Sequence, residues 1–137
     1  MSRRIALDTG ALIALASPRD QYHLRAREQI DRVTRNRQHL IGTTLVLAEL
    51  HRYVAQALGP KRGLDTLTKA ADDPRITWVE VTHSMVLETI ARWLAPQSHP
   101  SYTLTDAATF ELMRREGIDT AFAFDQHFVA AGFRLLP

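Results

Sequence analysis

The chain has 137 residues, enough for one domain with a substantial hydrophobic core and too few for two. Apolar residues make up 45% of it, which excludes a disordered chain, and no apolar run is long enough to span a membrane. There is no cysteine, which excludes disulfides, thiolate metal sites and cysteine nucleophiles. The net charge of +2 combines a basic first half with an acidic second half, so an anionic partner and ordinary charged surface both stay open.

The first half of the chain is predicted to alternate strands with helices. The apolar run at residues 4–8 ends in a carboxylate, which is typical of a buried parallel strand. Over residues 22–37 apolar side chains recur on one helical face and charged ones on another, which predicts an amphipathic helix. In chain order, the expected elements are a strand at 4–8, helices at 11–15 and 22–37, a strand at 40–42 and a helix at 44–58.

The second half continues this alternation. The helix expected at 104–116 has Thr105 as its predicted N-cap and Gly117 as its predicted C-cap, and Asp106 shares a stripe with the core-facing Phe110. A carboxylate in that position needs a compensating partner or a polar cavity at the first turn. In chain order, the expected elements are a helix at 61–71, a strand at 76–81, a helix at 82–95, a loop at 97–102, the helix at 104–116, and strands at 120–124 and 133–136.

Strands that alternate with helices pair in parallel through right-handed crossovers. The predicted fold class is therefore an α/β sandwich on a mainly parallel sheet of four or five strands. No linker, repeat or low-complexity segment interrupts the pattern, so residues 1–137 are expected to form a single domain. The N-terminus reaches Asp8 too soon for a signal peptide, and a cytoplasmic protein with no membrane association is expected.

Four acidic residues are expected at one edge of this sheet. In open parallel sheets the carboxyl ends of the strands and the N-termini of the following helices share an edge, where ligands bind. Asp8 and Asp125 directly follow strands. Asp106 opens one helix, and Glu49 lies in the first turns of another. The sequence therefore predicts that these four carboxylates meet in one pocket.

Each of these acids also has a local explanation, which stays open at this point. Asp8 and Asp125 would each cap a turn or a helix, and Asp106 suits the positive end of a helix dipole. Glu49 would pair with Arg52 on the helix surface. The edge that all four share favours a common site.

Clustered carboxylates repel one another unless a cation neutralises them. A set of oxygen ligands suits Mg²⁺, with Mn²⁺ as a substitute, rather than zinc. Because Mg²⁺ is commonly held by a few carboxylates together with substrate phosphate oxygens, the set indicates phosphoryl chemistry. The six histidines show no metal-binding spacing, and His127, two residues after Asp125, is not expected to be a ligand.

Four short segments carry a family resemblance. They read IALDTGALI at 5–13, TTLVLAEL at 43–50, LTDAA at 104–108 and FDQHF at 124–128. In this order and spacing they resemble a PIN domain, specifically the VapC-type ribonuclease toxins of bacterial and archaeal toxin–antitoxin pairs. A lesser pattern that joins Asp20, His23 and Ala26 is similar to that family as well.

The resemblance implies a PIN-like three-layer α/β/α fold and a Mg²⁺-dependent endoribonuclease that cleaves single-stranded or loop RNA. It also implies a homodimer that a small VapB-like antitoxin inhibits. The catalytic and metal-binding residues of the family fall on the same quartet, which is Asp8, Glu49, Asp106 and Asp125. The chain departs from the family at Gly10, where Ser or Asn is common, so Thr9 or Thr105 is a candidate for a hydroxyl that contacts substrate.

The expected reaction is attack of a metal-activated water on an RNA phosphodiester, and Arg25 is a candidate for binding the RNA backbone. RNAs with exposed loops, such as tRNA and ribosomal RNA, are the expected substrates. One alternative is a non-catalytic, degenerate PIN-like binding module, which Gly10 leaves open. Another is an aspartyl-phosphate phosphatase with Asp8 as nucleophile, which Gly10 disfavours because those enzymes usually carry a second acid there.

Overall fold

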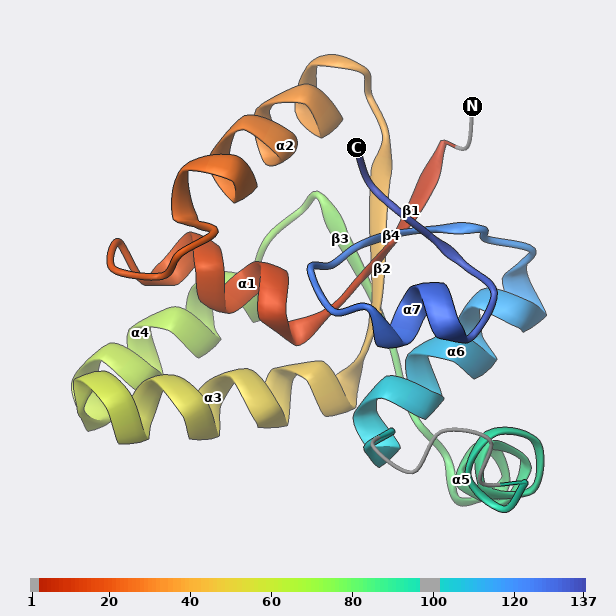
Figure 1. The fold of residues 1–137 in the computed structure, drawn as a ribbon. Helices are drawn as coiled ribbons and strands as arrows, with labels where there is room; N and C mark the ends of the chain where they lie inside the picture. The colour runs from red at the N-terminus through yellow and green to blue at the C-terminus, as the bar shows by residue number, and fades with distance from the viewer. Residues whose placement is uncertain (1–2, 97–101) are drawn as a thin grey trace.

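The structure is a computed structural model that describes residues 3–96 and 102–137. Its centre is a five-stranded sheet in the order β3-β2-β1-β4-β5, in which every neighbouring pair is parallel (Figure 1). In chain order the strands are β1 (Arg4–Leu7), β2 (His39–Thr43), β3 (Ile76–Val79), β4 (Thr120–Phe122) and β5 (Arg134–Leu135). The predicted α/β class, with four or five mainly parallel strands, is confirmed.

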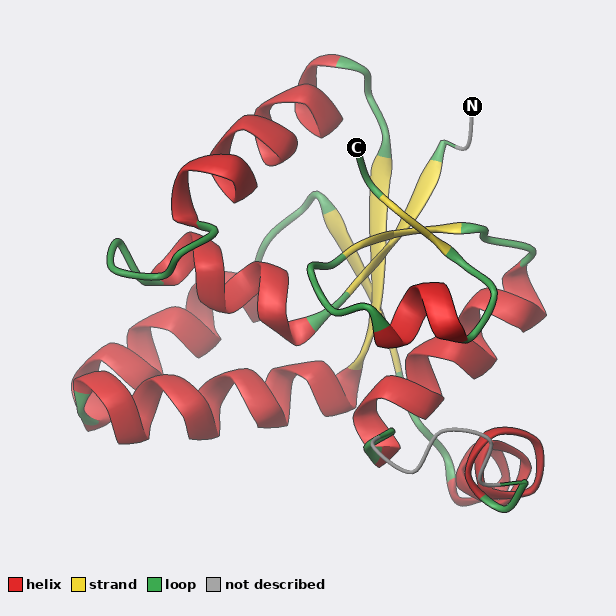
Figure 2. Cartoon of the chain, in the orientation of Figure 1, coloured by secondary structure: helices red, strands yellow, loops and turns green. Residues whose placement is uncertain are grey.

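Helices cover both faces of the sheet, as Figure 2 shows. In chain order they are α1 (Thr9–Ala16), α2 (His23–Arg35), α3 (Thr44–Leu58), α4 (Pro60–Ala71), α5 (His83–Thr89), the π-helix η1 (Ile90–Leu94), α6 (Leu104–Glu116) and α7 (His127–Ala130). Helices α1 and α2 pack on one face, and α5, α6 and α7 pack on the other. This is the three-layer α/β/α sandwich that the resemblance implied. Within the described residues, no helix is both long and apolar enough to cross a membrane.

The central strand β1 shows how the sequence specifies this core. Ile5 and Leu7 pack with α1 and α2, whereas Ala6 packs in the cluster that contains α6. Side chains of a strand alternate between the two faces of a sheet, so an apolar run without polar positions is buried on both sides. Asp8 follows directly and is carried to the carboxyl edge at the middle of the sheet.

Helices α3 and α4 form a hairpin beside α1. Gly63 lies so close to α3 that a Cβ on it would stand 2.8 Å from the Cβ of Ala55, a distance that only glycine avoids. Leu50 of α3 is fully buried in a cluster with Ala70 of α4, and Leu12 of α1 packs against this cluster. These contacts hold α3, and with it Glu49, at the side of the sheet where β1 ends.

Two segments differ from what the sequence suggested, and a third lies almost entirely outside the described residues. The single helix predicted at 82–95 is α5 followed by η1, in which the amide of Ala95 donates to the carbonyl of Ile90, five residues back. The segment after Asp125, where a turn capped by this acid was the local alternative to a site role, forms the short helix α7. The loop predicted at 97–102 falls almost entirely outside the described residues.

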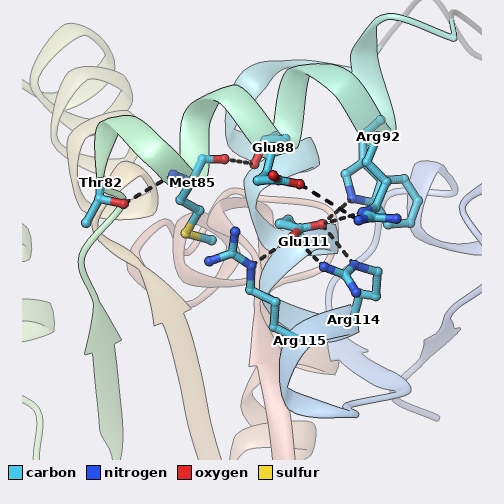
Figure 3. A network of polar contacts seen from close by, with 9 residues as sticks. Thr82, Met85, Glu88, Arg92, Glu111, Arg114 and Arg115 are labelled. Atoms are coloured by element: carbon cyan, nitrogen blue, oxygen red, sulfur yellow. Dashed lines mark hydrogen bonds and ion pairs between the residues drawn. The ribbon is translucent and has the colours of Figure 1, made fainter.

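A buried carboxylate joins η1 to α6 (Figure 3). Glu111 is fully buried, and the guanidinium groups of Arg114 and Arg115 lie 2.8 Å from its Oε2. From η1, Arg92 Nε and Trp93 Nε1 each lie 3.2 Å from its Oε1. The hydrogen bonds from Arg114 are the largest cause that lowers the pKa of Glu111 to about 2. This carboxylate is therefore a fully compensated structural group.

Candidate active site

The order of the strands creates an edge where a ligand site is expected. From β1 the chain first builds outward through β2 and β3, and later returns to add β4 and β5 on the opposite side. Loops that leave β1 and β4 therefore diverge, and a crevice forms at their carboxyl ends. The amide of Asp8, which follows β1, donates to the carbonyl of Phe122 in β4 at 3.1 Å. The two strands remain paired up to the point where the acidic residues begin.

A hollow at this edge is lined by five carboxylates. They are Asp8, Asp20, Glu49, Asp106 and Asp125. Among the described residues, neither Lys nor Arg contributes to its lining. The predicted quartet is thus brought together, and Asp20 joins it from the loop between α1 and α2. The pattern that joins Asp20 to His23 was the sequence signal for this fifth acid.

Asp8 both caps a helix and faces the hollow. It is the N-cap of α1, where its Oδ2 accepts from the amide of Gly10 at 3.4 Å. The pKa of Asp8 is raised from 3.8 to about 7. The largest cause is burial, and the second is the negative charge of Asp106. Hydrogen bonds from the amides of Gly10 and Thr9 oppose this increase. The local role and the shared site therefore coexist in one residue.

Asp106 is held by a capping box at the start of α6. The N-cap is Thr103, whose backbone is extended and whose Oγ1 accepts from the amide of Asp106 at 3.1 Å. In return, Asp106 Oδ2 accepts from the amide of Thr103 at 3.2 Å. The prediction of Thr105 as N-cap is wrong, because Thr105 already lies within the helix and its carbonyl accepts from Thr109. The reciprocal bonds fix the carboxylate of Asp106 at the floor of the hollow, where it is only 8% exposed.

His127 lies between two of the acids. Its Nδ1 is 3.4 Å from Asp106 Oδ2 and 3.2 Å from Asp125 Oδ2. The turn is fixed by the amide of His127, which donates to Asp125 Oδ1 at 2.8 Å. Ligand atoms of these three residues lie within 4.8 Å of one another, a spacing that suits a metal ion. The sequence places His127 two residues after Asp125 but did not predict it as a ligand, whereas in the structure its ring lies with the carboxylates of Asp106 and Asp125.

Glu49 borders the same hollow from α3. Glu49 is half-buried. The sequence left open that it pairs with Arg52 on the helix surface, but the ion pairs of the described residues do not include this pair. It is not part of the group formed by Asp106, Asp125 and His127. A contribution from Glu49 to a metal site would therefore be made across the hollow, most simply through water.

The three predicted substrate-binding residues are placed differently from the quartet. Thr9 is 2% exposed, and its Oγ1 has no hydrogen-bond partner among the described residues. Thr105 is half-buried at the start of α6. Neither lines the acidic hollow. Arg25 is exposed on α2 and lines a separate hollow, which it shares with Tyr22 and Phe124.

The residues present fit a divalent cation. A carboxylate as buried as Asp8 would normally be paired with a positive group, but no Lys or Arg in the described residues borders it in the hollow. The donor set is dominated by oxygen, which suits Mg²⁺ and Mn²⁺. Gly10 also has a role here, because a Cβ at this position would lie 3.3 Å from Asp8 Oδ2.

Comparison with known proteins agrees with this geometry. Residues 5–134 match the PIN domain family. Two relatives from Mycobacterium tuberculosis, strains CDC 1551 / Oshkosh and ATCC 25618 / H37Rv, are both named 23S rRNA-specific endonuclease VapC20. Each is 31% identical over 134 residues, 94% of this chain and 95% of theirs.

A solved structure gives the same result. The crystal structure of Mycobacterium tuberculosis VapC20, described as a sarcin-ricin loop cleaving toxin, matches with a TM-score of 0.82 and 25% identity. The match covers 94% of this chain and 95% of that one. The resemblance to VapC-type ribonucleases is confirmed, and the chain belongs to the PIN-domain family.

Proposed function

We propose that residues 1–137 act as a single PIN domain that hydrolyses RNA phosphodiester bonds with the help of a divalent metal ion, as the toxin of a VapBC pair. The observation that carries this proposal is the hollow at the end of β1 and β4, which five carboxylates line without a Lys or Arg among the described residues. Such a hollow repels a phosphate unless a cation is bound. A metal-dependent nuclease needs such a site, because the bound cation lets the acidic hollow accept the phosphate of the substrate.

Asp8, Asp106 and Asp125 would hold Mg²⁺, or Mn²⁺ in its place, and Glu49 would contribute through water. When bound, the metal would supply a water of lowered pKa and would offset negative charge on the phosphate. The capping box keeps the carboxylate of Asp106 in place before the metal arrives. His127 fixes the carboxylates of Asp106 and Asp125 relative to each other, because its Nδ1 contacts both.

The proposed substrate is RNA with an exposed loop, in which unpaired bases can be splayed and read. The relatives named for 23S rRNA and the solved toxin named for the sarcin-ricin loop make that loop the first substrate to test. A VapB-like antitoxin, a homodimeric state and a cytoplasmic location complete the proposal. Co-expression with the product of an adjacent short reading frame should relieve growth arrest, and light scattering should give the mass of a dimer.

Replacement of single acids tests the site. Asp8→Asn and Asp106→Asn should each abolish Mg²⁺-dependent cleavage of a sarcin-ricin loop hairpin, while Asp72→Asn, an exposed acid at the end of α4, should keep it. Calorimetric titration with Mn²⁺ should show binding that only the first two variants lose. A protein that neither binds Mn²⁺ nor cleaves RNA would instead be a degenerate PIN-like module.

A further inference from the structure

An aromatic pair borders the acidic hollow. The rings of Tyr22 and Phe124 are stacked, with centroids 4.4 Å apart and planes 5° from parallel. Phe124 directly precedes Asp125, and its ring meets the fully buried ring of Phe122 edge-on. Tyr22, in contrast, keeps 38% of its surface exposed. The pair therefore extends the core to the protein surface beside the carboxylates.

The same two rings line a second hollow. Because Tyr22 and Phe124 are the residues common to both hollows, they form the partition between them. The second hollow has a different chemistry: Arg25, Gln29 and Gln126 supply its polar groups, and no carboxylate of the described residues lines it. An acidic hollow and a hollow with guanidinium and amide groups thus lie on either side of one aromatic wall.

Gln29 leaves one hydrogen-bonding group unused beside this second hollow. Its side chain is 1% exposed, and its Nε2 donates to the carbonyl oxygens of Leu136 and Pro137 at 2.8 and 3.3 Å. Its Oε1 has no partner among the described residues. Buried polar atoms are normally satisfied, so an unsatisfied acceptor in the lining of a hollow indicates a place for an incoming donor.

The backbone of Tyr22 is held by its loop, and its ring is held by the stack on Phe124. The amide of Tyr22 donates to Asp20 Oδ1 at 2.8 Å, and the amide of His23 donates to the carbonyl of Asp20 at 3.0 Å. The ring of His23 in turn bonds to the carbonyl of Ala14 in α1 at 2.7 Å. A positioned aromatic ring loses little conformational freedom when a ligand stacks on it.

We propose that the second hollow is a nucleobase subsite, which takes the unpaired base next to the scissile phosphate. This inference rests on the proposed ribonuclease function. The base would contact the Tyr22–Phe124 pair through its π-face, as bases do on aromatic platforms in single-stranded RNA complexes. The amides of Gln29 and Gln126 match the donors and acceptors on a base edge, and Arg25 suits the adjoining phosphate.

A fluorescent base tests this assignment. A sarcin-ricin loop hairpin and an unstructured 12-nucleotide RNA would each carry 2-aminopurine at one unpaired position at a time, with Ca²⁺ replacing Mg²⁺ to slow cleavage. Stacking quenches 2-aminopurine, so one position should be quenched by the wild type and by Tyr22→Phe. Tyr22→Leu should remove that quenching and raise the Kd for RNA by about fivefold or more. Arg25→Gln should also weaken binding, while the matched control Arg27→Gln, exposed on the same helix and outside both hollows, should not.

The outcomes separate the subsite from the nuclease. If Asp8→Asn abolishes cleavage but Tyr22→Leu changes neither quenching nor affinity, the subsite is wrong and the nuclease remains. If the wild type binds neither RNA, both proposals are wrong. Should Tyr22→Leu fail to fold, an abasic residue at the quenched position must weaken binding by the wild type to a similar extent; unchanged binding of that RNA overturns the subsite.

Discussion

Helix α6 carries two buried carboxylates five residues apart, and their surroundings are opposite. Asp106, 8% exposed, faces a hollow that holds four further carboxylates. Glu111, fully buried, is surrounded by the guanidinium groups of Arg92, Arg114 and Arg115 (Figure 3). Five residues advance a helix by about 500°, so the two side chains leave α6 in different directions. One helix thus serves an uncompensated acidic centre and a compensated structural one.

The pKa values express the same contrast. Asp8, a neighbour of Asp106 in the hollow, has its pKa raised to about 7 by burial and by the charge of Asp106. Glu111 has its pKa lowered to about 2, first by hydrogen bonds from Arg114. Burial alone therefore does not distinguish a functional acid from a structural one. The sign of the charge around the carboxylate does, because an acid without cationic side chains is ready for an external cation.

The largest effect on stability is expected at Glu111. Glu111→Gln leaves Arg92, Arg114 and Arg115 without their shared anion, and removal of one partner from a buried ion cluster typically costs about 3–5 kcal/mol. Because the three arginines are partly exposed, we expect the free energy of unfolding to fall by about 3 kcal/mol in a urea titration. Mn²⁺ affinity of the folded protein should be unchanged. The control Glu116→Gln, at an exposed pair with Arg4, should change stability by less than about 1 kcal/mol.

The opposite sign is expected at Asp8 in metal-free protein. Asp8→Asn removes a buried charge that its neighbours disfavour and retains a residue suited to the N-cap of α1. The free energy of unfolding at pH 8 in EDTA should rise by about 2 kcal/mol, less than the full pKa shift implies because a polar group stays buried. An equal or lower stability than wild type would contradict the view of this hollow as uncompensated. Asp72→Asn is again the matched control.

The pH dependence of stability separates the two centres further. The raised pKa of Asp8 means that folded protein binds more protons than unfolded protein between about pH 4 and 7. Metal-free wild type should therefore lose stability relative to Asp8→Asn as the pH rises through this range, by at most about 1.4 kcal/mol per unit. Glu111 has a lowered pKa, so its contribution is present above pH 4.5 and is lost as the pH falls toward 2. Parallel urea titrations of wild type, Asp8→Asn and Glu111→Gln from pH 3 to 8 would measure both pH dependences of the free energy of unfolding.

The acidic edge was predictable from sequence because it depends on general properties of parallel sheets. Asp8 follows an apolar run that is buried on both faces, and Asp125 follows another. The carboxyl ends of parallel strands share one edge whatever the strand order. Their closeness depends in addition on the strand order, which the sequence did not predict and which makes β1 and β4 neighbours. Asp106 was expected at the same edge because its helix leads into β4.

Other features depend on contacts that a single segment does not encode. Thr103 and Thr105 are both acceptable N-caps by residue type, and only the reciprocal bonds with Asp106 select Thr103. The π-helix η1 presents Arg92 and Trp93 to Glu111, which lies on α6, 18 residues beyond Trp93 in the sequence. Long-range partners of this kind leave no local periodicity, so the Glu111 cluster could not be predicted.

The smallest effect is expected at Gly10, where the acidic hollow meets its helix cap. A Cβ at this position would lie 3.3 Å from Asp8 Oδ2, so Gly10→Ala should push the carboxylate by a few tenths of an ångström. Mn²⁺ affinity should fall by about tenfold or less, at the low end of what changes beside a metal ligand cost, because the carboxylate is displaced only slightly and keeps its hydrogen-bond partners. Stability should change little, because alanine favours α1 by up to about 1 kcal/mol while the close contact opposes it. The control is Gly63→Ala, which should reduce stability because its Cβ would meet Ala55 at 2.8 Å, but should leave Mn²⁺ affinity unchanged. Calorimetry with Mn²⁺ would measure the affinity of both variants. A gain in affinity for Gly10→Ala would mean that Asp8 is not a ligand in its present position.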